Sequence, residues 1–172
     1  MSGFVAGQTG LIVAVPEAEG AVGRLRATYD VAASFGVPAH VTVLFPFLPY
    51  AEVDPAVSAD LAAIAASVPA FDVTFARVRR WPSVCWLEPD PDGPFRRLTE
   101  LVAGRWPDHQ PYGGEFDDVV PHLTVAEGDA SVLDRAEREV EPGLPVRAHV
   151  ARLDLIAFDG ERWEAAAHWP LG

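Results

Sequence analysis

The sequence predicts an α+β protein of two similar lobes, in which antiparallel strands face a shared groove and helices lie on the outside. Three observations support this prediction. Apolar residues make up 49% of the 172-residue chain, enough for a substantial core. Each half of the chain repeats the same order of elements. No low-complexity tract or linker separates the halves, so we expect one domain of two lobes spanning residues 1–172.

The first half is predicted to alternate strands and helices before its closing strand pair. Residues 9–16 form a short apolar run bounded by Gly and Pro, which is typical of a buried strand. Residues 17–30 have a helical pattern, and residues 36–47 form the next strand. The Ala-rich residues 54–68 are predicted to be helical, with Asp54 as the N-cap and a proline directly after it.

Residues 70–81 and 83–89 form the strand pair that closes the first half, because apolar and polar side chains alternate along residues 70–81. The second half then repeats the order. It has a helix at residues 93–106, whose apolar side chains recur at helical spacing, a strand at residues 119–127 and a helix at residues 129–140.

The chain ends in two predicted strands, residues 145–158 and 162–171. Asp159–Gly160 lies between them, and this dipeptide is typical of a tight β-hairpin turn. The two halves therefore repeat in organisation and not in sequence.

Both halves carry the pattern His-x-Thr on a strand, once as His40 and Thr42 and once as His122 and Thr124. Side chains two residues apart point to the same face of a strand, so each histidine shares a face with its threonine. The apolar residues between and after them occupy the other face. If the lobes are related by a pseudo-two-fold axis, the two polar pairs converge in one groove.

Such a groove can carry out acid–base chemistry on a phosphate ester. Histidine titrates near pH 6.5, so one imidazole can remove a proton from an attacking oxygen while the other protonates a leaving oxygen. Threonine hydroxyls can donate hydrogen bonds to the phosphoryl oxygens. This chemistry needs no metal, no cofactor and no covalent enzyme intermediate.

The alternative is that each pair is an ordinary structural histidine beside a β-branched residue. A single His-x-Thr pattern is weak, and its recurrence in matched halves favours a site. We expect the other three histidines to be surface or packing residues and the lone cysteine to be a buried structural thiol, since no metal-ligand spacing and no other catalytic motif is present. These residues are His109, His149, His168 and Cys85.

The paired motif resembles that of the 2H phosphoesterases, a family that includes bacterial 2′-5′ RNA ligase-like proteins and cyclic nucleotide phosphodiesterases. Residues 83–102, 116–126 and 151–172 also resemble the family, so the likeness covers nearly the whole chain. The resemblance implies the two-lobed fold and a substrate with a 2′,3′-cyclic phosphate, an ADP-ribose cyclic phosphate or a 2′-5′ linkage.

The resemblance also implies the roles of the four motif residues. His40 and His122 correspond to the general acid and base, and Thr42 and Thr124 correspond to the residues that bind the substrate phosphate.

Charge restricts the partners. The net charge is −12, and no basic stripe follows the chain, so a long nucleic-acid duplex is excluded as a ligand and large RNA substrates are disfavoured. A small nucleotide or a short RNA end fits better. We expect a cytoplasmic monomer with no membrane partner, because no apolar run approaches the roughly 18 residues of a membrane span and no secretory signal precedes residues 9–16.

Several further residues have two interpretations. Arg79–Trp81 either contacts a phosphate and stacks on a nucleobase, or forms the solvated end of a strand. Tyr112 lies either at the rim of the groove or in an ordinary loop position. Phe47 and Tyr50 form either a platform for a nucleobase or part of the core.

We therefore predict a metal-independent hydrolase of a cyclic phosphodiester. Two alternatives stay open from the sequence: a non-catalytic module that binds a nucleotide or RNA end, and a 2′-5′ RNA ligase.

Overall fold

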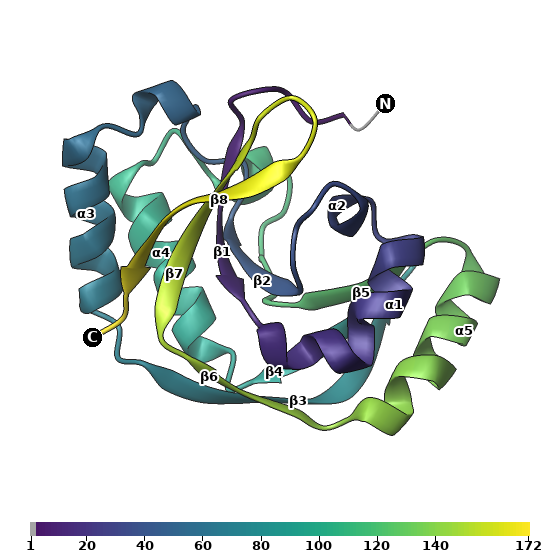
Figure 1. Ribbon diagram of the computed structural model, residues 1–172. Helices are drawn as coiled ribbons and strands as arrows, with labels where there is room; N and C mark the ends of the chain where they lie inside the picture. Colours follow the sequence, from purple (N-terminus) through teal and green to yellow (C-terminus); the bar gives the residue numbers. More distant parts are fainter. Residues whose placement is uncertain (1–2) are drawn as a thin grey trace.

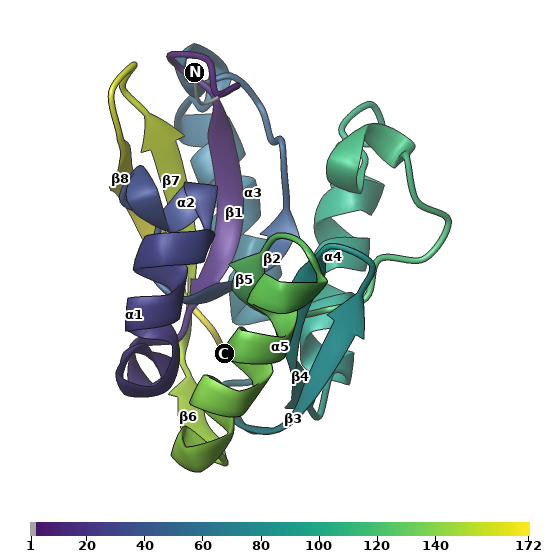
Figure 2. The same cartoon turned by 90° about the vertical axis from the view of Figure 1, so that its right-hand side faces the viewer.

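The computed structural model describes residues 3–172, and within them the strands form two four-stranded antiparallel sheets. Sheet A has the order β2 (His40–Leu44), β1 (Thr9–Ala14), β7 (Arg152–Phe158) and β8 (Trp163–Pro170). Sheet B has the order β5 (Leu123–Glu127), β4 (Val84–Asp90), β3 (Phe71–Trp81) and β6 (Val146–Val150). The two sheets form separate walls of the molecule (Figure 2). The predicted α+β class is confirmed.

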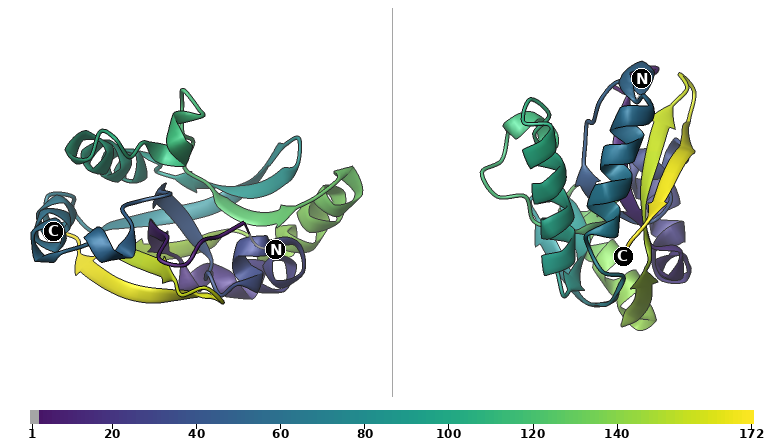
Figure 3. Two further views of the ribbon diagram at one scale, coloured as in Figure 1. Left: turned by 90° about the horizontal axis from the view of Figure 1, so that it is seen from above. Right: turned by 90° about the vertical axis from the view of Figure 1, so that its left-hand side faces the viewer.

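The helices flank the sheets as two pairs, with α1 against α5 and α3 against α4 (Figures 1 and 3). The helices are α1 (Glu19–Tyr29), α2 (Val31–Ser34), α3 (Pro55–Ala66), α4 (Gly93–Arg105) and α5 (Ala130–Val140). Short 3₁₀ turns cover Pro16–Ala18 (η1), Tyr50–Glu52 (η2), Pro111–Gly114 (η3) and Glu141–Gly143 (η4). The four longer helices lie within a few residues of their predicted bounds, whereas α2 was not predicted.

Each sheet combines strands from both halves of the chain. Strands β3 and β4 follow the first His-x-Thr strand in sequence, yet β4 pairs with β5, the strand of the second motif. Conversely, β7 and β8 follow the second motif, and β7 pairs with β1 in the sheet of the first motif. The two lobes are therefore interlocked and do not correspond to the two halves of the sequence.

The prediction of one strand over residues 145–158 was wrong, because the chain passes from sheet B to sheet A at Ala151. The buried positions explain the break. Val146, Ala148 and Val150 are buried at every second residue, but the next such position is Leu153. This step of three interrupts the period of two that a single strand requires.

Buried and cavity-facing side chains alternate along the motif strands, as predicted. Val41 and Val43 are at most 1% exposed, whereas His40 and Thr42 are half-buried. Residues 122–125 repeat this alternation in the second copy. The apolar face joins one hydrophobic cluster that contains residues of both sheets and of helices α1, α3, α4 and α5. Burial of each such side chain contributes about 1.5–3 kcal/mol.

A buried ion pair lies between α1 and α2. Nε and Nη2 of Arg26 are each 2.9 Å from Oδ2 of Asp30, and the two side chains are only 3% and 4% exposed. Nη1 of Arg26 donates to the carbonyl of Val37 at 3.1 Å, shortly before His40. Oδ1 of Asp30 accepts a hydrogen bond from the Ala32 amide at 3.0 Å and so caps α2. The pair ties two helices to the segment that enters β2.

Replacing Arg26 by alanine should lower the free energy of unfolding by about 3–5 kcal/mol, because Asp30 would stay buried without its cation. Arg135→Ala is the matched control. Arg135 and Glu139 are also one helical turn apart, at 2.8 Å, but both side chains are exposed and their loss should change stability little. Urea unfolding of the two variants measures the difference, and equal effects would contradict a structural role for the buried pair.

Candidate active site

Both His-x-Thr pairs line one cavity of about 250 Å³, where β2 and β5 approach each other. His40 is the first residue of β2, and His122 directly precedes β5. Thr42 and Thr124 follow on the same faces and line the same cavity. The structure thus brings together the four residues that the sequence singled out.

The two histidines make the same hydrogen bond to the backbone. Nδ1 of His40 is 2.8 Å from the carbonyl oxygen of Pro38, and Nδ1 of His122 is 2.8 Å from that of Val120. A carbonyl oxygen only accepts hydrogen bonds, so Nδ1 carries the proton in each neutral ring and Nε2 keeps its lone pair. Each imidazole therefore has the tautomer in which Nε2 can act as a proton acceptor.

Burial controls the protonation of both rings. The pKa of His40 is lowered to about 4, chiefly because burial disfavours the imidazolium and also because Arg26 and His122 lie nearby. Burial likewise lowers the pKa of His122. Below about pH 6.5 the unfolded chain binds more protons than the folded one, so the histidine contribution to stability is lost as the pH falls from about 6.5 towards 4.

Tyr112, in the turn at Pro111–Gly114, also lines the cavity, which favours the groove over the ordinary loop position. Burial raises the pKa of its phenol, and a hydrogen bond with Thr42 opposes that rise. Its φ is +51°, in the left-handed region that bulky residues rarely adopt. The Tyr112 amide donates to the carbonyl of Phe45 at 2.7 Å, so a contact with the segment after β2 holds this strained conformation beside Thr42.

An apolar wall from sheet A forms another side of the cavity. The rings of Phe45 and Trp163 lie 5.9 Å apart in a second hydrophobic cluster that also includes Phe4. The Phe45 ring approaches β1 closely because position 10 is glycine: a Cβ there would lie 3.0 Å from Phe45 Cδ2. The sequence did not reveal this wall, because its aromatic residues come from opposite ends of the chain.

Two carboxylates, Asp30 and Glu127, also line the cavity. Burial and the negative charge of Asp30 raise the pKa of Glu127. These acids are far apart in the sequence, and no motif connected them to the histidines. Asp30 already accepts hydrogen bonds from Arg26 and the Ala32 amide, whereas the exposed Glu127 can accept one from a donor group of a ligand.

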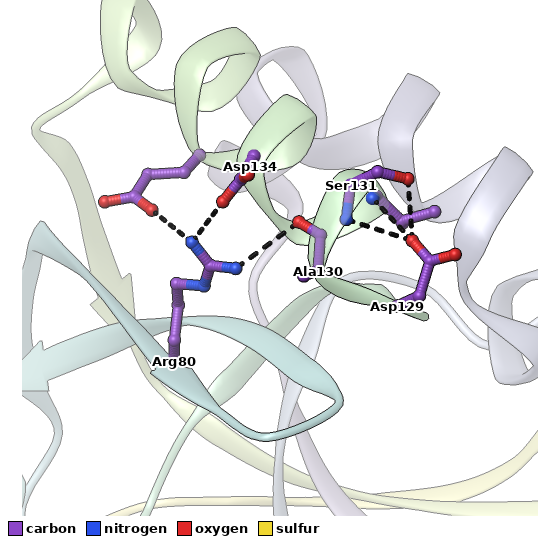
Figure 4. A network of polar contacts seen from close by, with 7 residues as sticks. Arg80, Asp129, Ala130, Ser131 and Asp134 are labelled. Carbon is purple, nitrogen blue, oxygen red and sulfur yellow. Dashed lines mark hydrogen bonds and ion pairs between the residues drawn. The ribbon is translucent and has the colours of Figure 1, made fainter.

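Within Arg79–Trp81, the two arginines fit one interpretation and the tryptophan fits the other. Arg79 pairs with Glu88 at 2.7 Å, and Arg80 pairs with Asp134 of α5 at 2.6 Å (Figure 4). These ion pairs support the interpretation of the arginines as a strand end. Trp81 instead lies beside the site, with its ring centroid 4.7 Å from that of His122.

The remaining candidates do not line the cavity. Phe47 is a core residue, 4% exposed and packed against Trp106, and Tyr50 is 52% exposed. The predicted buried thiol is confirmed: Cys85 is fully buried, and burial raises its pKa to about 11. The other histidines also lie away from the cavity; they are His109, His149 and His168.

Two kinds of feature are absent from residues 3–172. No group of three or more His, Cys, Asp or Glu side chains in this range is arranged to hold a metal ion. No helix in this part of the chain has both the length and the apolar character needed to cross a membrane.

The two-sheet fold with paired His-x-Thr strands is the arrangement of the 2H phosphoesterase family. Residues 14–162 match the model of the 2′-5′ RNA ligase superfamily, so the chain belongs to that superfamily, most of whose members are enzymes. The family resemblance seen in the sequence is thereby confirmed. A comparison with curated proteins gave no match.

Solved structures share the fold at low sequence identity. Escherichia coli LigT complexed with NADP⁺ is 19% identical over 98% of this chain and 99% of its own, with a TM-score of 0.58. TT0787 of Thermus thermophilus is 18% identical over 95% and 97%, with a TM-score of 0.62. Usb1 of Kluyveromyces marxianus is 13% identical over 96% and 99%, with a TM-score of 0.50.

Long-range ¹H–¹⁵N NMR spectra should show both site histidines as Nδ1–H tautomers at pH 7, because each Nδ1 bonds to a carbonyl. The His40 signal should titrate near pH 4, and the His122 signal below pH 6.5. His40→Gln and His122→Gln assign the signals. Nε2–H tautomers, or titration of both rings at or above pH 6.5, would contradict this description.

Proposed function

We propose that the protein is a metal-independent phosphoesterase that hydrolyses a cyclic phosphodiester, with a 2′,3′-cyclic phosphate of a nucleotide or RNA end as its substrate. The observation that carries this proposal is the pair of imidazoles with matched backbone hydrogen bonds in one cavity. E. coli LigT, whose crystal structures contain NADP⁺, 3′-AMP or ATP, supports a nucleotide as the ligand.

In the proposed reaction, water attacks the phosphorus and gives its proton to Nε2 of the basic histidine. The bond from phosphorus to one ribose oxygen breaks, and the acidic histidine protonates that oxygen, leaving a phosphomonoester and a hydroxyl group. Thr42 and Thr124 donate hydrogen bonds to the phosphoryl oxygens. The negative charge of the bound diester favours the protonated form of the imidazole next to it, which offsets the effect of burial.

We assign the basic role to His40 and the acidic role to His122. The positive charge of Arg26 disfavours protonation of His40, and this effect is larger than the opposing effect of Asp30. Among the described residues, no neighbouring charge shifts the pKa of His122. The proton that is taken up when the substrate binds therefore resides on His122. Its Nδ1–H keeps the hydrogen bond to the Val120 carbonyl, and its Nε2–H faces the leaving oxygen.

A substrate panel tests the proposed function. The protein should hydrolyse a 2′,3′-cyclic mononucleotide or ADP-ribose 1″,2″-cyclic phosphate, and EDTA should leave the rate unchanged. The panel also includes 2′-5′ oligoadenylate, and hydrolysis of this linear substrate alone would contradict the cyclic phosphodiester as substrate. If none of these substrates is hydrolysed, the protein is better described by the alternative, a non-catalytic module that binds a nucleotide or RNA end. Ligation of tRNA halves at low salt would favour the ligase. Loss of activity with EDTA and recovery with Mn²⁺ would contradict the metal-free mechanism.

His40→Ala and His122→Ala should each lower the rate by about 10²–10⁴-fold, the range for a lost acid or base. The double variant should be little worse than the worse single variant, because the two groups act as a unit. Thr42→Ala and Thr124→Ala should cost less, with part of the loss in KM. The melting temperature of each sample is measured beside kcat/KM. A histidine variant that melts at a lower temperature but keeps its kcat/KM would show that the replaced histidine has a structural role.

The assignment of acid and base has its own test. A cyclic substrate with sulfur in place of the leaving oxygen releases a thiolate that needs no protonation. This substrate should restore much of the rate of His122→Ala and little of the rate of His40→Ala. The reverse pattern would exchange the two roles.

A further inference from the structure

A second groove lies beside the catalytic cavity, on the side of sheet B. It encloses about 520 Å³ and is lined by the turn between β3 and β4 and by the segment before β5. The residues that matter for its chemistry are Trp81, Tyr112, Phe116, Asp118 and His122.

The groove adjoins the catalytic cavity, because His122 and Tyr112 line both. A ligand whose phosphorus lies between the histidines can therefore extend past His122 without leaving the protein surface. Across the cavity, the apolar wall with Phe45 and Trp163 lies on the side of sheet A. Aromatic side chains therefore line both the cavity with the histidine pair and the groove that adjoins it.

The aromatic rings of the groove are incompletely covered by protein. Trp81 and Phe116 are 36% and 56% exposed, which is unusual for such large apolar side chains. Trp81 is held in place by Trp86, with ring centroids 4.7 Å apart, and Phe116 lies 5.9 Å from Tyr112. Rings that are fixed by neighbours yet open on one face form a platform for stacking.

The charge of the groove indicates which part of a nucleotide it fits. None of the described residues that line it is Lys or Arg, and the carboxylate of Asp118 is paired with Arg96 at 2.9 Å. A further phosphate group would therefore lack a cation here. A neutral planar group fits, and in a phosphodiester substrate that group is a nucleobase.

We propose that this groove binds a second nucleobase, so that the substrate is at least a dinucleotide: the cyclic phosphate at the end of an oligonucleotide, in preference to a free cyclic mononucleotide. This inference rests on the proposed function, whose phosphate site it extends. The terminal nucleoside occupies the cavity, and the base of the preceding nucleotide stacks in the groove.

The test compares kcat/KM for the 2′,3′-cyclic phosphates of adenylyl-adenosine and of adenosine. The wild-type protein should prefer the dinucleotide by about tenfold or more, equivalent to about 1.4 kcal/mol for one stacked base. Phe116→Ala should bring this ratio close to one, since Phe116 borders the groove and not the cavity. Tyr50→Ala is the control, because Tyr50 is also an exposed aromatic residue but lies outside the groove, and its ratio should not change.

Dissociation constants for the 3′-phosphorylated dinucleotide and mononucleotide separate the two proposals. If neither cyclic phosphate is hydrolysed, but the dinucleotide binds more tightly and Phe116→Ala removes the difference, the hydrolase fails and the groove assignment stands. If both cyclic phosphates are hydrolysed at equal efficiency, or if Phe116→Ala leaves the preference intact, the groove assignment is overturned while the proposed hydrolase remains.

Discussion

The alternation of side chains along β2 and β5 connects the core of the protein to its cavity. Along β2, and along β5 with the residue before it, one face supplies valine or leucine to the shared hydrophobic cluster, and the other supplies a histidine and a threonine to the cavity. A shift of either strand by one residue would expose the apolar side chains and bury the polar ones. The packing that stabilises the fold therefore also fixes which side chains meet in the cavity.

Two side chains of α1 form hydrogen bonds to the backbone just before His40. Oε1 of Glu19 accepts a hydrogen bond from the Ala39 amide at 2.7 Å, and Arg26 donates to the carbonyl of Val37 at 3.1 Å. These contacts flank Pro38, whose carbonyl sets the tautomer of His40. The Arg26–Asp30 ion pair and the Glu19 side chain therefore help to hold the backbone that sets the tautomer of His40.

The sequence was sufficient to predict features that depend on local periodicity: the α+β class, the longer helices and the convergence of the His-x-Thr pairs. Features that depend on contacts between distant residues were either left undecided, as the place of Tyr112 was, or missed, as the apolar wall was. Tyr112 lines the cavity because of a backbone bond to Phe45, and the aromatic wall joins Phe4 to Trp163. The break between β6 and β7 did have a local signal, the step of three between Val150 and Leu153, which the prediction of a single strand overlooked.

The most direct test of paired acid–base catalysis is the pH dependence of kcat/KM for a 2′,3′-cyclic phosphate. One imidazole must be neutral and the other protonated, so the profile should be a bell whose limbs are macroscopic pKa values of the coupled pair. Because burial lowers the pKa of both histidines in the free protein, the maximum should lie below about pH 6.5. A rate that rises through neutrality to an alkaline plateau would contradict the account.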